Sequence, residues 1–269
     1  MNRKPYFSMI FLAVLTLGCV FADFIMPYDP VYMNLAEINA APSAAHIFGT
    51  DTLGRDIFSM IWYGGRISLT VAVVSTLIST GIAVVYGSIA GLAGRTLDEL
   101  LMRFTEILMS IPGILLVIFI QAMLGEPTVL SIAAVIGLTS WMSVAKMVRS
   151  EVKQIRNSDY ILAARTMGGR FFYMLRRHLA PNFMSAIMFM VVTNLGSAIA
   201  TEATLSFLGI GLPTNVVSWG SLMSLSQKAI LTGSWHLLLI PGAVLVCTII
   251  CITETGEYMR TAGSRERLL

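Results

Sequence analysis

Two glutamates, Glu106 and Glu202, lie inside apolar runs of the sequence, where an ionised side chain exposed to lipid would cost several kcal/mol. Glu106 precedes Ser110 and Pro112 on the same run. A proline there is expected to kink a helix, and a carboxylate beside irregular backbone can line a pathway. The alternative is that Glu106 forms a structural ion pair with Arg103 near the end of the run.

The second carboxylate, Glu202, lies deeper in its apolar run, with the hydroxyls of Thr201, Thr204 and Ser206 nearby. Hydroxyl groups can satisfy a carboxylate that is removed from water. We therefore expect Glu202 to face the interior of a helix bundle or a subunit interface. Direct contact with a transported substrate is the alternative.

The residue types and their spacing do not predict a catalytic site, a metal site or a nucleotide-binding site. The histidines His46, His178 and His236 are scattered, and the methionines and cysteines lie mainly in apolar runs, so no metal site is predicted. No lysine follows a glycine, so the Gly-x-x-x-x-Gly-Lys-Ser/Thr loop that holds nucleotide phosphates is absent. We expect no catalytic residue and no cofactor in this chain.

The elements that position these side chains are expected to be transmembrane helices. The chain has 269 residues, of which 56% are hydrophobic and 12% charged, against roughly 45–50% and about 25% in soluble domains. Apolar runs of about twenty residues, enough to cross the hydrocarbon layer, recur along the sequence. The sequence predicts spans near residues 6–26, 68–92, 104–124, 128–148, 183–208 and 237–257.

The positive charges give this arrangement an orientation. With the N-terminus inside, only Arg55, Arg66 and Lys228 of the 18 lysines and arginines fall outside. Cytoplasmic loops carry the excess of positive charge in membrane proteins. The prediction is an all-α membrane protein of about six transmembrane helices with both termini in the cytoplasm.

A polar stretch before the second span, residues 27–67, contains a Gly-rich run in which Asp51, Arg55 and Asp56 can pair. Glycines there permit a tight turn. One interpretation is a structural plug over the helix ends. The other is an outer vestibule or a docking surface for a substrate-binding protein.

The stretch 149–182, between spans 4 and 5, is predicted to form a cytoplasmic helix-Gly-helix unit. Asn157 or Ser158 can cap the first helix, and Asp159 favours its first turn. Gly168 and Gly169 supply a stop, and the pair Ala163 and Ala164 offers a shallow face for a partner. Alternatively, its arginines at 165, 170, 176 and 177 hold a surface hairpin to anionic lipid.

Three separated motifs give this chain a resemblance to a known family. The run from Asp159 to Gly169, closed by Pro181-Asn182, resembles the "EAA" loop of ABC importer permeases, with Leu162 in place of the first glutamate. The runs Gly49–Asp56 and Tyr63–Leu69, and Leu205–Gly211 with Ser218-Trp219-Gly220, are similar to the dipeptide, oligopeptide and nickel permease family. With Pro27-Tyr28-Asp29-Pro30, they point to its C-type subunit, and the tail Thr253–Arg260 departs from the family pattern.

The resemblance implies a coupling helix, formed by Asp159, Ala163, Ala164, Arg165, Gly168 and Gly169, that docks into a cytoplasmic ATPase. It further implies a heterodimer with a second permease subunit, two ATPase subunits that bind ATP and Mg, and an extracytoplasmic substrate-binding protein. Residues 1–67 would form a first helix and outer loop, and residues 68–269 the core permease domain. Nucleic acid is not expected as a partner.

The implied function is ATP-driven import of di- or oligopeptides by alternating access in a bacterial or archaeal plasma membrane. Nickel or a metal chelate stays open as substrate, because a chelated metal needs no protein ligand. Two other classes also stay open. An ion-coupled secondary transporter would use midplane ionisable residues such as Glu202, and a membrane scaffold would leave the helix-Gly-helix unit without a role.

Overall fold

The computed structural model describes residues 5–168, 170–213, 215–230 and 233–266. Within these ranges the regular secondary structure is helical, apart from one isolated bridge between Thr50 and Asp56. Three helical segments are long and apolar enough to cross a membrane, or five if each of two bent helix pairs is one span. The expected all-α fold with several candidate spans is therefore found in the described part of the chain.

The three long segments are α3 (Ile57–Leu92), the segment Phe171–Phe207, and α12 (His236–Glu266), of which His236–Thr261 passes the test. The segment Phe171–Phe207 joins α9 (Phe171–Met174), a π-helical turn η2 (Leu175–Leu179) and α10 (Ala180–Phe207). A shorter apolar helix, α1 (Tyr6–Val20), is followed by the single turn α2 (Ala22–Ile25).

Helix α3 begins eleven residues before the predicted span 68–92, at Ile57. Asp56 caps it, accepting a hydrogen bond of 2.8 Å from the Ser59 backbone N–H. Ser59 and Arg66 lower the mean hydropathy of this part, yet Ser59 is fully buried and Arg66 donates to the Cys19 carbonyl of α1. A hydropathy window therefore assigns the first third of this helix to a loop.

The predicted spans 104–124 and 128–148 are broken helices rather than straight ones. Helix α4 (Arg95–Met109) meets α5 (Gly113–Leu124) at 87°, and α6 (Val129–Thr139) meets α7 (Met142–Ile155) at 45°. The first break lies at Pro112, which has no N–H to donate to the preceding turn. The expected kink at Pro112 is thus a sharp corner.

Helix α3 is the central element, with α6, α7 and α10 packed along it. Glycine makes the contact with α7 close. A Cβ on Gly87 would lie 2.5 Å from the Ala145 carbonyl oxygen, and one on Gly91 would lie 2.6 Å from Val152. Small residues four apart allow two helix backbones to approach closely in membranes, so α3 and α7 form one tightly packed pair.

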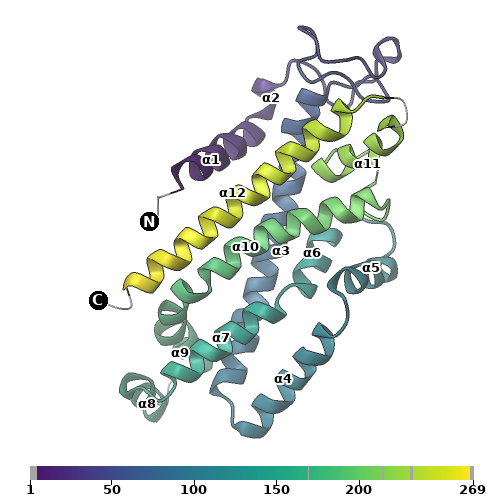
Figure 1. The fold of residues 1–269 in the computed structure, drawn as a ribbon. Helices are drawn as coiled ribbons and strands as arrows, with labels where there is room; N and C mark the ends of the chain where they lie inside the picture. Colours follow the sequence, from purple (N-terminus) through teal and green to yellow (C-terminus); the bar gives the residue numbers. More distant parts are fainter. Residues whose placement is uncertain (1–4, 169, 214, 231–232, 267–269) are drawn as a thin grey trace.

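Figure 1 shows how the non-spanning parts are distributed. The outer coil, residues 26–56 with the 3-10 turn η1 (Leu35–Glu37), lies at one end of the bundle together with the start of α12. A further helix, α11 (Trp219–Ile230), forms near that end inside the predicted polar stretch 209–236. Helix α8 (Asp159–Thr166) and the start of α4 lie at the opposite end.

Candidate functional site

The helix-Gly-helix unit is formed by α8 and α9, which lie between α7 and α10 as the sequence predicts. Asp159 is the first residue of α8, where a carboxylate interacts favourably with the helix dipole. Gly168 follows the helix with φ of +77°, a conformation that L side chains rarely adopt. The side chains of Ala163 and Arg165, and Gly169 as a whole, lie outside the described residues.

One member of the predicted alanine face of α8 is described. Ala164 is buried, 9% exposed, and lies on the same side as the fully buried Ile161, because residues three apart share a helix face. Apolar exposure comes instead from Tyr160, Leu162 and Met167, which are 43%, 44% and 87% exposed. These three side chains are larger than alanine, and the alanine motif alone did not indicate them.

A cluster of charges between α4 and α7 was not among the predicted site residues. The Asp98 carboxylate, on the first turn of α4, accepts hydrogen bonds from Arg149 and Lys153 on α7, with Arg149 Nη2 at 2.7 Å. Asp98 is 4% exposed. Little in the sequence indicated this cluster, because the partners of Asp98 are more than fifty positions away and charged residues are common in the predicted cytoplasmic segments.

Among the outer-loop candidates, Asp51 and Arg55 form a buried ion pair. Arg55 Nε donates a hydrogen bond to Asp51 Oδ2 at 2.8 Å, and Arg55 Nη2 lies 2.7 Å from the same oxygen. Asp51 Oδ1 also accepts from the backbone N–H groups of Leu53 and Arg55, each at 2.8 Å. The pair therefore fixes the turn that leads into α3.

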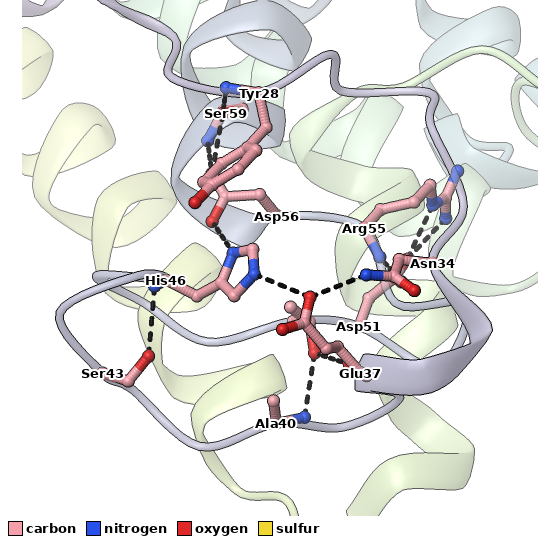
Figure 2. A network of polar contacts seen from close by, with 11 residues as sticks. Tyr28, Asn34, Glu37, Ala40, Ser43, His46, Asp51, Arg55, Asp56 and Ser59 are labelled. Atoms are coloured by element: carbon pink, nitrogen blue, oxygen red, sulfur yellow. Dashed lines mark hydrogen bonds and ion pairs between the residues drawn. The ribbon is translucent and has the colours of Figure 1, made fainter.

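The third outer-loop candidate, Asp56, belongs to a separate network centred on His46 (Figure 2). His46 Nδ1 lies 2.9 Å from Asp56 Oδ1, and His46 Nε2 lies 3.2 Å from Glu37 Oε2. Only a doubly protonated imidazole can donate to both carboxylates. Burial lowers the pKa of His46, but its hydrogen bonds to Asp56 and Glu37 and their charges outweigh that effect and raise the pKa above its ordinary value.

The sequence left His46 as a scattered loop histidine, because neither Glu37 nor Asp56 is adjacent to it in the chain. The network also reaches Asn34, whose side-chain amide donates to Glu37 at 2.8 Å. The ring of Tyr28 lies 4.7 Å from the His46 ring, centroid to centroid. The outer coil is thus joined to the start of α3 through one imidazole.

Glu202 lies in the interior of the bundle, with no exposed surface. It accepts hydrogen bonds from the hydroxyls of Ser218 at 2.8 Å, Ser206 at 2.9 Å and Ser68 at 3.1 Å. These serines come from the approach to α11, from α10 and from α3. The carboxylate therefore joins three segments that are far apart in the sequence.

A cavity of about 390 Å³ opens next to Ser206, between the α5–α6 turn and α11. Its wall includes the exposed Glu126 with Ser221 and Ser224. Glu126 was not among the predicted candidates, since it follows an apolar run instead of lying inside one.

Around the corner between α4 and α5, Glu106 is paired with Lys146 of α7 at 3.7 Å and not with Arg103. Ser110 donates to the Ile107 carbonyl of its own helix at 2.7 Å. Glu106, Ser110 and Pro112 are all exposed on the surface of this chain. The structure therefore brings none of them into contact with Glu202 or Ser206.

Among the described residues, no group of three or more histidine, cysteine, aspartate or glutamate side chains is arranged to hold a metal ion. The His46 network, with one imidazole between two carboxylates, is internally bonded. The arrangement supports polar and electrostatic roles for these residues.

Comparisons with known proteins agree over nearly the whole chain. Residues 83–254 match the family described as the binding-protein-dependent transport system inner membrane component. Residues 2–42 match the N-terminal transmembrane domain of oligopeptide transport permease C.

Three curated relatives are similar to nearly the whole of this chain. The dipeptide transport system permease protein DppC of Bacillus subtilis is 38% identical, covering 97% of this chain and 81% of that protein. The oligopeptide transport system permease protein OppC of the same organism is 35% identical over 99% and 85%. The glutathione transport system permease protein GsiD of Pectobacterium atrosepticum is 32% identical over 94% and 84%.

A solved structure shares the fold. A chain of the MetNI methionine ABC transporter, in an inward-facing conformation, superposes with a TM-score of 0.58 at 17% identity, covering 76% of this chain and 96% of that one. The family match, the curated relatives and this fold agree. The chain belongs to the binding-protein-dependent transport system inner membrane components, the permease subunits of ABC importers.

Proposed function

We propose that this chain is the C-type permease subunit of an importer for di- or oligopeptides, which moves its substrate by alternating access. The observation that carries the proposal is the similarity to dipeptide and oligopeptide permeases over 97% and 99% of the chain. The match of residues 2–42 to the N-terminal domain of oligopeptide transport permease C supports the C-type assignment. The transporter would reside in a bacterial or archaeal plasma membrane.

We further propose six spans, with α1 and α2 together forming the first and each bent pair forming one. Both termini and α8 would then be cytoplasmic, which agrees with the excess of lysine and arginine on that side. Residues 1–67 would supply the first span and the outer coil, and residues 68–269 the core, although the central helix itself starts at Ile57.

The assembly would contain a second, related permease subunit, two ATPase subunits and an extracytoplasmic binding protein. ATP and Mg would be bound by the ATPases. The α8 segment exposes three large apolar side chains close together in the sequence, Tyr160, Leu162 and Met167, and apolar surface exposed in this way favours a protein partner over water. They are the residues that we assign to ATPase docking.

Movement would pass from the ATPases into the bundle through α8. This helix follows α7 after three residues, and α7 is packed against α3 at Gly87 and Gly91. ATP-driven closure would therefore displace α7 and α3 together and shift the bundle between outward and inward access, the two-state element of the mechanism.

Reconstitution of the complete transporter in proteoliposomes tests the proposal. With ATP inside and liganded binding protein outside, we expect uptake of labelled di- or oligopeptides that stops when ATP is omitted. Uptake of nickel or a metal chelate without peptide uptake would show that the substrate is a metal or metal chelate and not a peptide. Peptide uptake driven by a proton or sodium gradient without ATP would instead support the secondary transporter.

A further inference from the structure

The contacts of α4 with the rest of the protein are few and mostly polar. Its buried residues are Asp98, Met102 and Thr105, which fall on one face because they are spaced by four and three positions. Thr105 donates to the hydroxyl of Tyr86 on α3 at 3.2 Å, and that hydroxyl donates to the Leu101 carbonyl at 2.7 Å. The other face exposes apolar side chains, among them Leu97, Leu100, Phe104 and Ile107.

Asp98 is the most strongly bonded of these contacts. Its two carboxylate oxygens receive three hydrogen bonds from two cations of α7, Arg149 and Lys153. The side chain of Asp98 is 5% exposed, whereas those of Arg149 and Lys153 are 27% and 33% exposed. A charge-assisted pair that is partly shielded from water is stronger than an exposed one.

The partners of Asp98 lie on the last turns of α7, a few residues before α8. Arg156, just beyond α7, also donates to the Gly91 carbonyl of α3 at 3.2 Å. Asp98 is therefore attached to the part of the bundle that directly precedes the coupling helix. At its other end α4 leads to the 87° corner and into α5.

We propose that Asp98 is a positioning residue that transmits movement of the coupling helix from α7 to α4. Through Arg149 and Lys153, a displacement of α7 carries α4 with it, and α5 follows around the corner at Pro112. Without the Asp98 carboxylate, α7 moves while α4 stays behind, so ATP is hydrolysed without full opening of the pathway. This inference rests on the proposed function for its readout of transport.

The test uses Asp98→Asn in the complete reconstituted transporter, with uptake and ATP hydrolysis measured together. We expect uptake per ATP hydrolysed to fall by about five-fold or more, the lower end of typical coupling between sites, with the amount of assembled ATPase unchanged. The matched control is Glu99→Gln. Glu99 is the next residue of α4, and its ion pair with Arg95 is exposed.

A charge exchange separates positioning from simple stability. Asp98→Lys combined with Arg149→Asp restores an ion pair between α4 and α7, so it should recover uptake per ATP relative to Asp98→Lys alone. Asp98→Glu, which keeps the carboxylate, should stay within about two-fold of the unaltered protein, since its pairs are retained.

A second readout does not depend on the substrate. After replacement of the three cysteines, spin labels at the exposed Leu100 of α4 and Ser150 of α7 report the distance between the helices. ATP should change this distance little in the unaltered protein and clearly in Asp98→Asn. If no peptide is taken up by the unaltered transporter, the proposed function fails while this distance still judges the role of Asp98.

Three results would overturn the inference. They are full uptake per ATP in Asp98→Asn, an equal loss in Glu99→Gln, and an ATP-dependent label distance that is the same with and without the Asp98 carboxylate.

Discussion

His46 links the outer coil to α3 as an imidazolium between Asp56 and Glu37, and this gives the coil a pH dependence. The pKa of His46 is raised above its ordinary 6.5 in the folded protein by these carboxylates, against the lowering effect of burial. A raised pKa means that the folded state binds the proton more tightly than the unfolded state. The stabilisation is therefore complete below the unfolded pKa and is lost as pH rises through the folded pKa.

We predict that His46→Gln lowers the free energy of unfolding by about 1–3 kcal/mol near pH 6, the range for an unsatisfied buried partner, and by less at about pH 9. Thermal unfolding of the purified protein in detergent, followed across this pH range, measures the difference. Asp51→Asn is the control, since it breaks a neighbouring ion pair that contains no histidine. A loss in His46→Gln that is independent of pH would contradict the role assigned to the imidazolium.

Glu202 is the second residue with a clear mutational prediction. Glu202→Ala leaves three buried serine hydroxyls without their acceptor and opens a cavity, so we expect a loss of at least about 2 kcal/mol in the free energy of unfolding. Glu202→Gln keeps the volume and one carbonyl acceptor and should cost less. Thr201→Ala, which removes only a hydroxyl bonded within its own helix, should leave the melting temperature nearly unchanged. Equal melting temperatures for Glu202→Ala and the unaltered protein would show that the serines do not depend on this carboxylate.

Among the helices, α3 offers a matched pair of glycines. A Cβ on Gly87 meets the Ala145 carbonyl and Val148 of α7, whereas a Cβ on Gly81 meets nothing within 4 Å. We predict that Gly87→Ala destabilises the protein by about 1–3 kcal/mol, as overpacking does. Gly81→Ala should be neutral or stabilising by up to about 1 kcal/mol, because alanine favours the helix. Unfolding in detergent measures both, and equal effects would mean that α3 and α7 are not closely packed there.

In α8, the proposed coupling helix, substitutions can test docking and packing separately. Met167→Glu, at a side chain 87% exposed, should abolish copurification of the ATPase with little change in the stability of the permease. Ala164→Leu should instead destabilise the permease by about 1–3 kcal/mol, since the site is already filled. Gly168→Leu strains the backbone by roughly 1–2 kcal/mol and should weaken docking and transport as well. Normal ATPase binding by Met167→Glu would show that the Met167 side chain is not part of the interface.

The sequence predicted helices well wherever a long apolar run coincides with a helix, as in α10 and α12. It failed where polarity is buried, because the start of α3 carries serines and an arginine that face neighbouring elements instead of water. Helix α4 begins nine residues before its predicted span because its first turns are amphipathic, which lowers mean hydropathy without breaking the helix. Helix α11 was missed for the same reason.

Site residues were predictable where the chemistry is local. The sequence placed Asp51, Arg55 and Asp56 in one Gly-rich turn where they can pair, and the structure pairs Asp51 with Arg55. It also placed Ser206 near Glu202, and the two are bonded. It could not find the partners of Asp98 or His46, or the bonds of Ser68 and Ser218 to Glu202, since those contacts depend on how distant segments pack. Nor could it tell which face of α8 is exposed, because that depends on the side turned to α7 and α10.

At the scale of the whole molecule, the proposed orientation can be tested directly. A reporter that is active only in the cytoplasm should be active when fused after Leu269 and inactive when inserted at Ala44 in the outer coil. We expect this result because lysine and arginine are concentrated on the predicted cytoplasmic side. A reporter inserted in α8 should be active, like the one at the C-terminus. Activity at both positions, or the opposite pattern, would contradict a six-span arrangement with an inside N-terminus.

The length of α3 has a geometric consequence for the transporter. Its 36 residues measure about 54 Å at 1.5 Å per residue, well beyond the roughly 30 Å of the hydrocarbon layer. The displacement of a rigid helix end grows with the helix length, so a tilt of about 10° at the α7 contact would move the far end by roughly 9 Å. The cap at Asp56, where the His46 network is attached, would then travel farthest of all, and a modest stroke on the ATPase side would become a large excursion at the mouth.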